Sequence, residues 1–314
     1  MLMILTIASL LFRACVVLFG TGLATFALLW NSPGDPAEAI AMARYDALLT
    51  EDVIDVVRTQ AGLDQGFWRA FFAWGKGVLR LEFGVSSVTG RPVLTDLGTA
   101  ALYTLPLAMG GLIIGLCLAL PLAILAARLP GSFMDRLAIA LASIGAAVPE
   151  FLLGLLLILL FAVHLDWLPT MGARTPAHAI LPALTLALGV AAALTRIIRS
   201  GILEGRNQPF MSALQRRGIK PWALGRDHVA PHAAIPVITV FGLELAFLLE
   251  GVVVVETIFS RPGLGSFLVK AIVARDFPQV QAAVLLTALV FVVVNGAIDL
   301  IYRAVDPRIG DDHA

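Results

Sequence analysis

Long apolar runs recur along the chain, and they restrict its possible folds more than any other feature. Residues 98–127 contain no charged side chain at all. A bilayer core is crossed by about 20 apolar residues in a helix, so several such runs indicate repeated crossings. The composition agrees, because 59% of the residues are apolar and only 14% are charged, against about a quarter charged in soluble domains. The sequence therefore predicts an all-α polytopic membrane protein.

We predict six transmembrane helices, each near the length that a bilayer requires. They lie at residues 14–30, 98–127, 137–163, 180–198, 233–255 and 280–301. A short apolar segment precedes the first span and is expected to form an elbow helix at the interface. The third span is interrupted by Val148–Glu150, a stretch that contains a proline.

These spans divide the chain into four parts. Residues 1–30 hold the elbow and the first span, and residues 31–98 are too charged to cross the membrane but long enough for a small extracytoplasmic subdomain. Residues 99–303 form a five-helix core that contains a basic loop, 203–232, and residues 304–314 form a tail.

The distribution of basic residues predicts the orientation. Short loops rich in Lys and Arg stay in the cytoplasm. The loop after the second span has Arg128 and Arg136, and residues 196–226 carry seven basic side chains, whereas the loop after the third span has only Arg174. Both termini and the basic loop are therefore expected in the cytoplasm, and residues 31–98 outside.

The basic loop 203–232 has the pattern of two short helices with a break. Phe210, Leu214 and Arg217 stand at i, i+4 and i+7, which favours a short amphipathic helix that Gly218 ends. Pro221 is suited to the first turn of a second helix. Such a structure on the membrane surface is either a docking site for a partner protein or only a basic interfacial anchor, and the pattern alone favours the anchor.

Several motifs resemble those of ABC importer permeases for dipeptides, oligopeptides and nickel. Ala213, Gly218 and the proline of "AIP", Pro236, fit the EAA motif of that family, although Ser212, Leu214 and Gln215 depart from its commoner residues. Seven further segments match in order: "SPGDPA", "GLDQ", "EFGVSSVTGRPV", "WLPTMG", "VVETIFSRPGLG", "RDFPQVQ" and "DPRI". The resemblance thus covers nearly the whole chain.

The resemblance implies a type I importer permease in the bacterial inner membrane and a set of partners. These are a second similar permease, two ABC ATPases that hold ATP and Mg²⁺, and an extracytoplasmic binding protein, with no cofactor in this chain. The loop that would dock on the ATPase contains Phe210, Ala213, Leu214, Arg217 and Gly218, with Pro236 after it. Arg261, Pro262, Gly263 and Gly265 would lie near the outer gate or the binding protein; an ordinary hairpin remains the alternative. Arg261 stands where the family often has an aromatic residue before the Pro-Gly pair.

Three acidic residues, Glu150, Glu244 and Glu250, lie inside predicted spans. A carboxylate in a span is costly, so such residues tend to face the bundle interior or an aqueous path. They either line the pathway, which would favour a cationic or zwitterionic substrate, or hold helices together by hydrogen bonds. Glu244 and Glu250 are separated by about 120° around a helix, so they do not share a face.

Other function classes lack a supporting motif. The sequence has no phosphate-binding P-loop, no metal-ligand cluster and no catalytic triad pattern, so the chain is not expected to be an enzyme. Cys15 and Cys117 lie in apolar runs and are interpreted as small core residues. A stand-alone secondary transporter using the glutamates, or a membrane scaffold, remains an alternative, and the cargo, peptide or nickel chelate, is left open.

Overall fold

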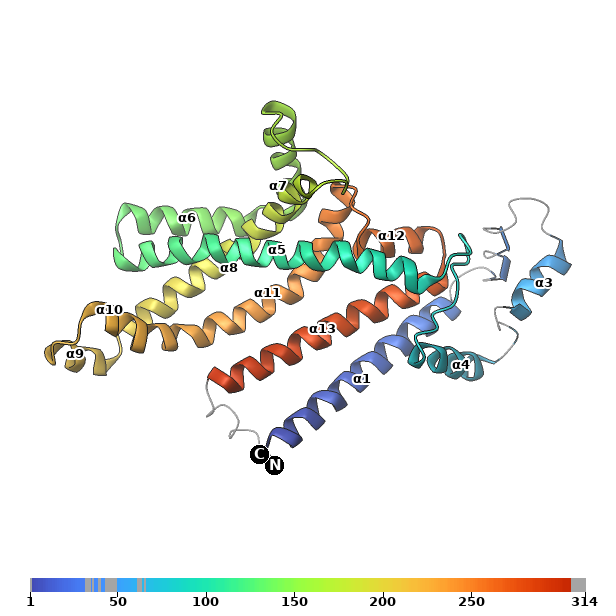
Figure 1. Ribbon diagram of the computed structural model, residues 1–314, viewed down its shortest axis with the longest axis horizontal. Helices are drawn as coiled ribbons and strands as arrows, with labels where there is room; N and C mark the ends of the chain where they lie inside the picture. The colour runs from blue at the N-terminus through green and yellow to red at the C-terminus, as the bar shows by residue number, and fades with distance from the viewer. Residues whose placement is uncertain are drawn as a thin grey trace. The chain divides into compact units, whose positions relative to one another are not determined.

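The computed structural model describes residues 2–31, 50–60 and 66–305, together with six isolated residues (35, 37, 38, 41, 42 and 64). Within this part of the chain the regular structure is helical, apart from one isolated bridge between Val85 and Pro92 (Figure 1). The α-helices are α1 (Leu2–Trp30), α3 (Glu51–Gln60), α4 (Phe67–Leu79), α5 (Val93–Arg128), α6 (Phe133–Ala147), α7 (Glu150–Leu157), α8 (Ile180–Arg206), α9 (Pro209–Arg216), α10 (Pro221–Leu224), α11 (Ala230–Ile258), α12 (Leu264–Val273) and α13 (Phe277–Val305).

Shorter helical pieces join some of these elements. A π-helix, Ile158–His164, continues α7, and a second one, Gly225–Val229, joins α10 to α11. A 3₁₀ turn, Pro176–Ala179, leads into α8.

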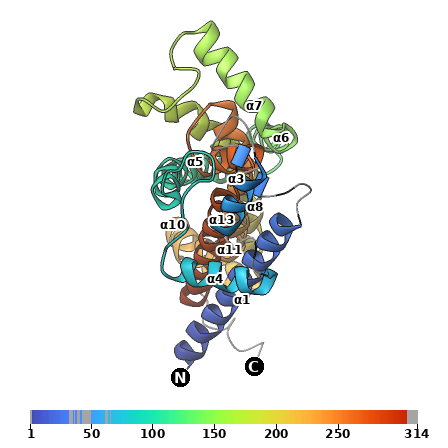
Figure 2. The same ribbon diagram turned by 90° about the vertical axis from the view of Figure 1, so that its right-hand side faces the viewer.

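The prediction of six transmembrane helices is confirmed. Among the described residues, five helices are long and apolar enough to cross a membrane, and the bent pair formed by α6 and the α7 segment makes a sixth when it is counted as one span. The break falls where the sequence predicts it: Val148 is extended and Pro149 has no N–H to continue the ladder of α6. The two halves are bent by 105°, and their different directions are visible in Figures 1 and 2.

Two details of the first part differ from expectation or stay open. The elbow is not a separate helix, because α1 runs unbroken from Leu2 to Trp30. The subdomain expected at residues 31–98 is described only in part, with α3, α4 and the loop before α5 in place. The motifs "SPGDPA" and "GLDQ" lie largely outside the described residues, and "DPRI" and the other tail residues from 306 onward lie wholly outside them.

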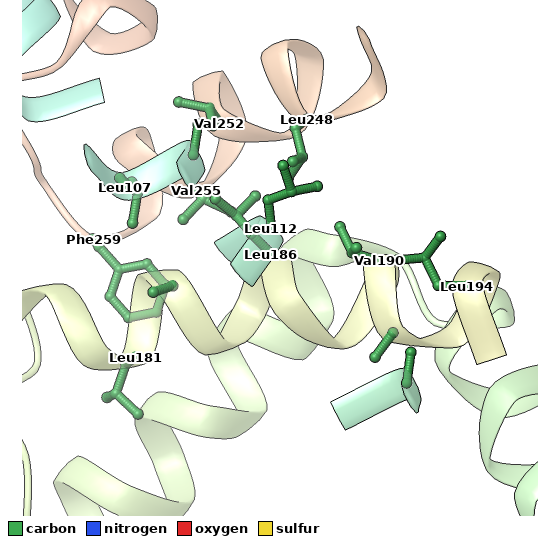
Figure 3. Close-up of a cluster of buried hydrophobic side chains, with 14 of the residues drawn as sticks. Leu107, Leu112, Leu181, Leu186, Val190, Leu194, Leu248, Val252, Val255 and Phe259 are labelled. Carbon is green, nitrogen blue, oxygen red and sulfur yellow. The ribbon is translucent and has the colours of Figure 1, made fainter. Parts of the chain in front are cut away.

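The chain divides into two compact units. The first comprises Met1–Thr104 and Pro262–Val293, and the second comprises Leu105–Arg261 and Val294–Ala314. The core of the first unit contains Val93, Leu97 and Ala282. The core of the second is formed by α5, α8 and α11, whose Leu112, Leu186 and Val255 are shown in Figure 3 with their neighbours.

Glycines let the helices of the second unit approach closely. A Cβ on Gly111 of α5 would lie 2.8 Å from the Cβ of Leu186, and one on Gly115 would lie 2.8 Å from the Cβ of Val190. Small residues at such contacts allow van der Waals packing between backbones, which is the main attraction between helices in lipid. Cys15 and Cys117, by contrast, are both exposed, so their interpretation as core residues is wrong: each faces outward from its own helix.

Candidate functional site

The 203–232 segment folds as the sequence predicts, into two short helices with a break. Helix α9 begins at Pro209 and ends at Arg216, and α10 begins at Pro221. Between them Gly218 adopts a φ of +76°, in the left-handed region that glycine enters without steric cost. Proline at the first position of both helices fits its fixed φ and missing N–H.

The segment is held together by a small core of apolar side chains. Met211, Leu224 and Val229 are buried together, and Leu214 and Ile219 pack against them. Two aromatic side chains of the segment are exposed: Phe210 by 48% and Trp222 by 75%. The segment is therefore a packed projection with an apolar and basic outer surface, of which Ala213 and Arg217 are also part.

The base of the segment is a close helix contact. Gly201 and Gly205 of α8 lie one turn apart and face the start of α11, where a Cβ on Gly205 would lie 3.2 Å from Val229 Cγ1 and one on Gly201 would lie 3.1 Å from Ala233 Cα. Pro236 lies inside α11, less than two turns after its start. Glycine at both positions therefore lets α8 pack closely against the start of α11.

The three intramembrane acids are separated into a pair and an outlier. Glu150 begins α7 at the break in its span, and its carboxylate lies against Gly251 of α11 and faces Gly189 of α8. Glu244 of α11 is likewise half-buried. Glu250 is exposed, on another side of α11. Among the described residues, no group of three His, Cys, Asp or Glu side chains is arranged to hold a metal ion.

The residues assigned to the outer gate fall in both compact units, and each unit is described by itself. In the second unit, Arg261 is buried and its Nη1 donates to the carbonyl of His178 at 3.1 Å, which ties the end of α11 to the entry of α8. In the first unit, Gly263 and Gly265 are buried while Pro262 is exposed. There the backbone N–H of Leu264 donates to Thr104 Oγ1 at 2.7 Å.

One ion pair in the second unit was not predicted from the sequence. Arg199 of α8 makes a two-pronged contact with the buried carboxylate of Asp135, from Nε at 2.5 Å and Nη2 at 2.8 Å. The same carboxylate accepts from the N–H of Gly131 at 2.7 Å. Two-pronged pairs fix geometry as well as charge, so Arg199, counted in the sequence only as a basic residue, positions α6 against α8.

A second cluster, in the first unit, joins two of the matching motifs. Asp276, which is 1% exposed, accepts hydrogen bonds from Ser86 Oγ and, at 3.1 Å, from the N–H of Ser87. Asp276 belongs to "RDFPQVQ" and the serines belong to "EFGVSSVTGRPV". The two motifs are therefore halves of one contact, which fixes the loop before α5 to the start of α13.

Comparison with known proteins agrees with this architecture. The family model "Binding-protein-dependent transport system inner membrane component" matches residues 119–311. The chain is 37% identical over 292 residues to the glutathione transport system permease protein GsiC of Escherichia coli strain K12, which covers 93% of this chain and 94% of GsiC. GsiC of Shigella dysenteriae serotype 1 gives the same values.

Two solved transporters share the fold. An inward-facing form of the MetNI methionine ABC transporter superposes with a TM-score of 0.54 at 19% identity, over 68% of this chain and 98% of that one. An amino acid ABC transporter also gives 0.54, at 18% identity, over 67% of this chain and 94% of that one. The fold is thus that of type I importer permeases, and the chain belongs to the binding-protein-dependent inner membrane components, as an ABC importer permease of the dipeptide and oligopeptide family.

Proposed function

We propose that this permease subunit forms half of a membrane pathway for short peptides and that the 203–232 segment couples the pathway to ATP hydrolysis. Membership of the family makes it an importer subunit that works with ATPase and binding-protein partners. Peptide cargo is supported by the relative GsiC, whose name refers to glutathione, a tripeptide. Nickel chelates have no such support, and neither has a stand-alone secondary transporter.

The observation that carries the coupling role is the form of the 203–232 segment. Met211 and Leu224 form its buried core, and Phe210 and Trp222 are exposed on its surface. The segment can therefore be displaced by a docked partner without unfolding. Its base is the glycine contact between α8 and α11. Closure of the ATPases would move this segment as a rigid body and switch the pathway between its two openings.

The remaining partners and roles are part of the same proposal. A second homologous permease completes the pathway, two ATPases bind ATP and Mg²⁺, and the binding protein docks near Arg261, Pro262, Gly263 and Gly265. We assign Glu150 and Glu244 to the pathway, where a carboxylate would favour the ammonium group of a peptide. Exposed Glu250 is assigned no contact with cargo.

Substitution of Gly218 tests the coupling role. Valine is β-branched and is strained at the φ of +76° found here, whereas asparagine tolerates that region. We expect Gly218→Val in the reconstituted importer to lower peptide uptake per ATP hydrolysed, and Gly218→Asn to retain most of it. Equal uptake per ATP in both variants, with equal insertion, would contradict the coupling assignment.

Cargo is tested separately, with the assembled importer in proteoliposomes. ATP is enclosed in the lumen, on the side of the ATPases, and labelled glutathione or a labelled dipeptide is added outside. An unlabelled nickel chelate is added outside as a competitor. We expect ATP-dependent peptide uptake that the chelate does not reduce. In a parallel assay with the ⁶³Ni-labelled chelate, uptake of ⁶³Ni without peptide uptake would reject the peptide assignment and leave the importer assignment intact.

A further inference from the structure

Helix α4 has an exposed apolar face that the transport function does not use. A helix turns by about 100° per residue, so Trp68, Phe72 and Leu79 fall within an arc of about 40° on one side of α4. Their side chains are 58%, 62% and 88% exposed. A contiguous apolar surface of this kind on a protein marks a contact with lipid or with another protein.

The neighbouring face of α4 is already occupied by α1. The ring centroid of Phe26 of α1 lies 5.5, 5.4 and 5.6 Å from those of Phe67, Phe71 and Trp74, respectively. Gly22 of α1 makes room for Trp74, because a Cβ there would lie 3.3 Å from the indole. These contacts hold α4 against the last turns of α1 (Figure 1), where the ring centroid of Trp30 also lies 5.8 Å from that of Phe67.

The contact with α1 sets the depth of α4 relative to the bilayer. The span of α1 covers Ala8–Trp30, and Trp30 stands at its end, where tryptophan is enriched at membrane interfaces. Phe26 precedes it by four residues, about 6 Å along the helix axis. Helices that lie in a membrane interface are immersed by about 5–10 Å. The apolar face of α4 is therefore held at the depth of lipid headgroups and upper acyl chains.

The charges of α4 fit the same placement. Arg69 and Lys76 lie within an arc of about 20°, next to the exposed apolar face, and Arg80 follows as the C-cap residue. The helix contains no acidic residue. Basic side chains beside an apolar face suit anionic headgroups above acyl chains.

We propose that α4 is an interfacial anchor, whose Trp68, Phe72 and Leu79 lie in the lipid of the leaflet at the Trp30 end of α1. The lipid contact of the apolar face continues that of α1 itself, of which only 11% of the apolar span is buried within the chain. The anchor fixes α4 to the membrane, and α4 in turn fixes the start of the 82–92 loop through the hydrogen bond from Glu82 N–H to the Gly77 carbonyl.

Spin labels on adjacent residues test the anchor. Phe72→Cys and Ala73→Cys are made in the chain with Cys15→Ser and Cys117→Ser, labelled, assembled with its partner subunits and reconstituted in bilayers with anionic lipid. Ala73 is exposed and lies on the basic side of α4, so it is the matched control. Collision rates are measured with O₂, which concentrates in acyl chains, and with a water-soluble nickel chelate.

We expect the ratio of O₂ to chelate collisions to be several-fold higher at Phe72→Cys than at Ala73→Cys. Trp68→Cys, on the same face, should behave like Phe72→Cys. Equal ratios at Phe72→Cys and Ala73→Cys would place the face in water and overturn the proposal. Protection of Phe72→Cys from both reagents would show that protein covers the face, such as the second permease, and would overturn it as well.

Discussion

Among single residues, Glu150 has the most closely defined surroundings of the intramembrane acids. Its carboxylate occupies a glycine notch formed by Gly251 and Gly189, and a Cβ on Gly251 would overlap the carboxylate. That carboxylate is the far end of a flexible side chain, so we expect Gly251→Ala to turn Glu150 aside and to lower the free energy of unfolding by only about 1 kcal/mol, the cost of a displaced rotamer. The thermal unfolding midpoint of the purified transporter measures this.

Gly189→Ala is the matched control for the glycine notch. A Cβ on Gly189 would lie 3.7 Å from Glu150 Oε1, an ordinary van der Waals contact. This variant should unfold at nearly the wild-type temperature. A much larger fall in the unfolding midpoint of Gly251→Ala alone would show that the Glu150 side chain cannot turn aside.

Asp276 is a second residue for which the structure gives a definite expectation. Asn at this position keeps the size of the side chain but removes the carboxylate to which Ser86 and Ser87 donate hydrogen bonds. Hydrogen bonds to a charged group contribute about 1.5–3 kcal/mol, so Asp276→Asn should loosen the loop before α5. Hydrogen exchange of the peptide that contains Ser87 should become faster in this variant.

An exposed ion pair beside the same loop provides the control for Asp276→Asn. Arg91 Nη2 lies 2.8 Å from Asp96 Oδ1, and the Arg91 side chain is 65% exposed. Exposed pairs contribute little. Arg91→Gln should therefore leave the exchange of the loop unchanged, and an equal acceleration in both variants would argue against a specific role for Asp276.

The residues themselves were visible in the sequence, but their partners were not. Glu150 and Glu244 stand out because charge inside an apolar run is costly. Nothing local to Glu150 points to Gly251, however, since the contact is made between separate helices about a hundred residues apart. Asp276 and Ser86 lie in motifs that could be recognised, yet only the fold brings these distant segments together.

At the scale of elements, helix ends were predictable and helix directions were not. Pro149, Pro209 and Pro221 each mark the start of a helix, and Gly218 marks a break, through rules that act within one turn. The 105° bend between α6 and α7 depends instead on how the two halves pack against other helices. Local sequence does not encode that angle.

The contact between α8 and α11 gives a prediction for these elements. Leucine in place of Gly205 would push against Val229, whose Cγ1 would lie 3.2 Å from the new Cβ. We expect Gly205→Leu to separate the helices at the base of the 203–232 segment and to lower peptide uptake several-fold, while the ATPases still bind. Uptake and copurified ATPase are both measured.

Gly225→Ala serves as the comparison within the same segment. Gly225 has a helical φ of −61°, and nothing lies within 4 Å of a Cβ built there. Uptake by this variant should match the wild type. A similar loss in Gly225→Ala and Gly205→Leu would mean that the segment tolerates no change, and that the helix contact is not the cause.

For the whole molecule, the number of membrane crossings follows from hydropathy. The partners of the basic residues, however, could not be predicted from the sequence. Arg199 and Arg206 were counted with the basic residues of one loop, yet Arg199 pairs with Asp135 and Arg206 donates to the carbonyl of Ala127 at 2.7 Å. Both therefore also position helices. Arg216, Arg217 and Lys220 remain exposed, so the cluster that marks a cytoplasmic surface is still present on the 203–232 segment.

That cluster predicts the sidedness of the chain, which cysteine labelling can decide. In the Cys15→Ser, Cys117→Ser chain, Thr89→Cys and Lys220→Cys each place a thiol at an exposed position, one in the loop before α5 and one between α9 and α10. With α6 and the α7 segment counted as one span, an odd number of spans separates the two positions, so we expect them on opposite faces of the membrane. We expect a membrane-impermeant maleimide to label Thr89→Cys in intact spheroplasts and Lys220→Cys only after permeabilisation. The reverse pattern would place the 203–232 segment outside, where no ATPase could bind, and would refute the coupling proposal together with the orientation.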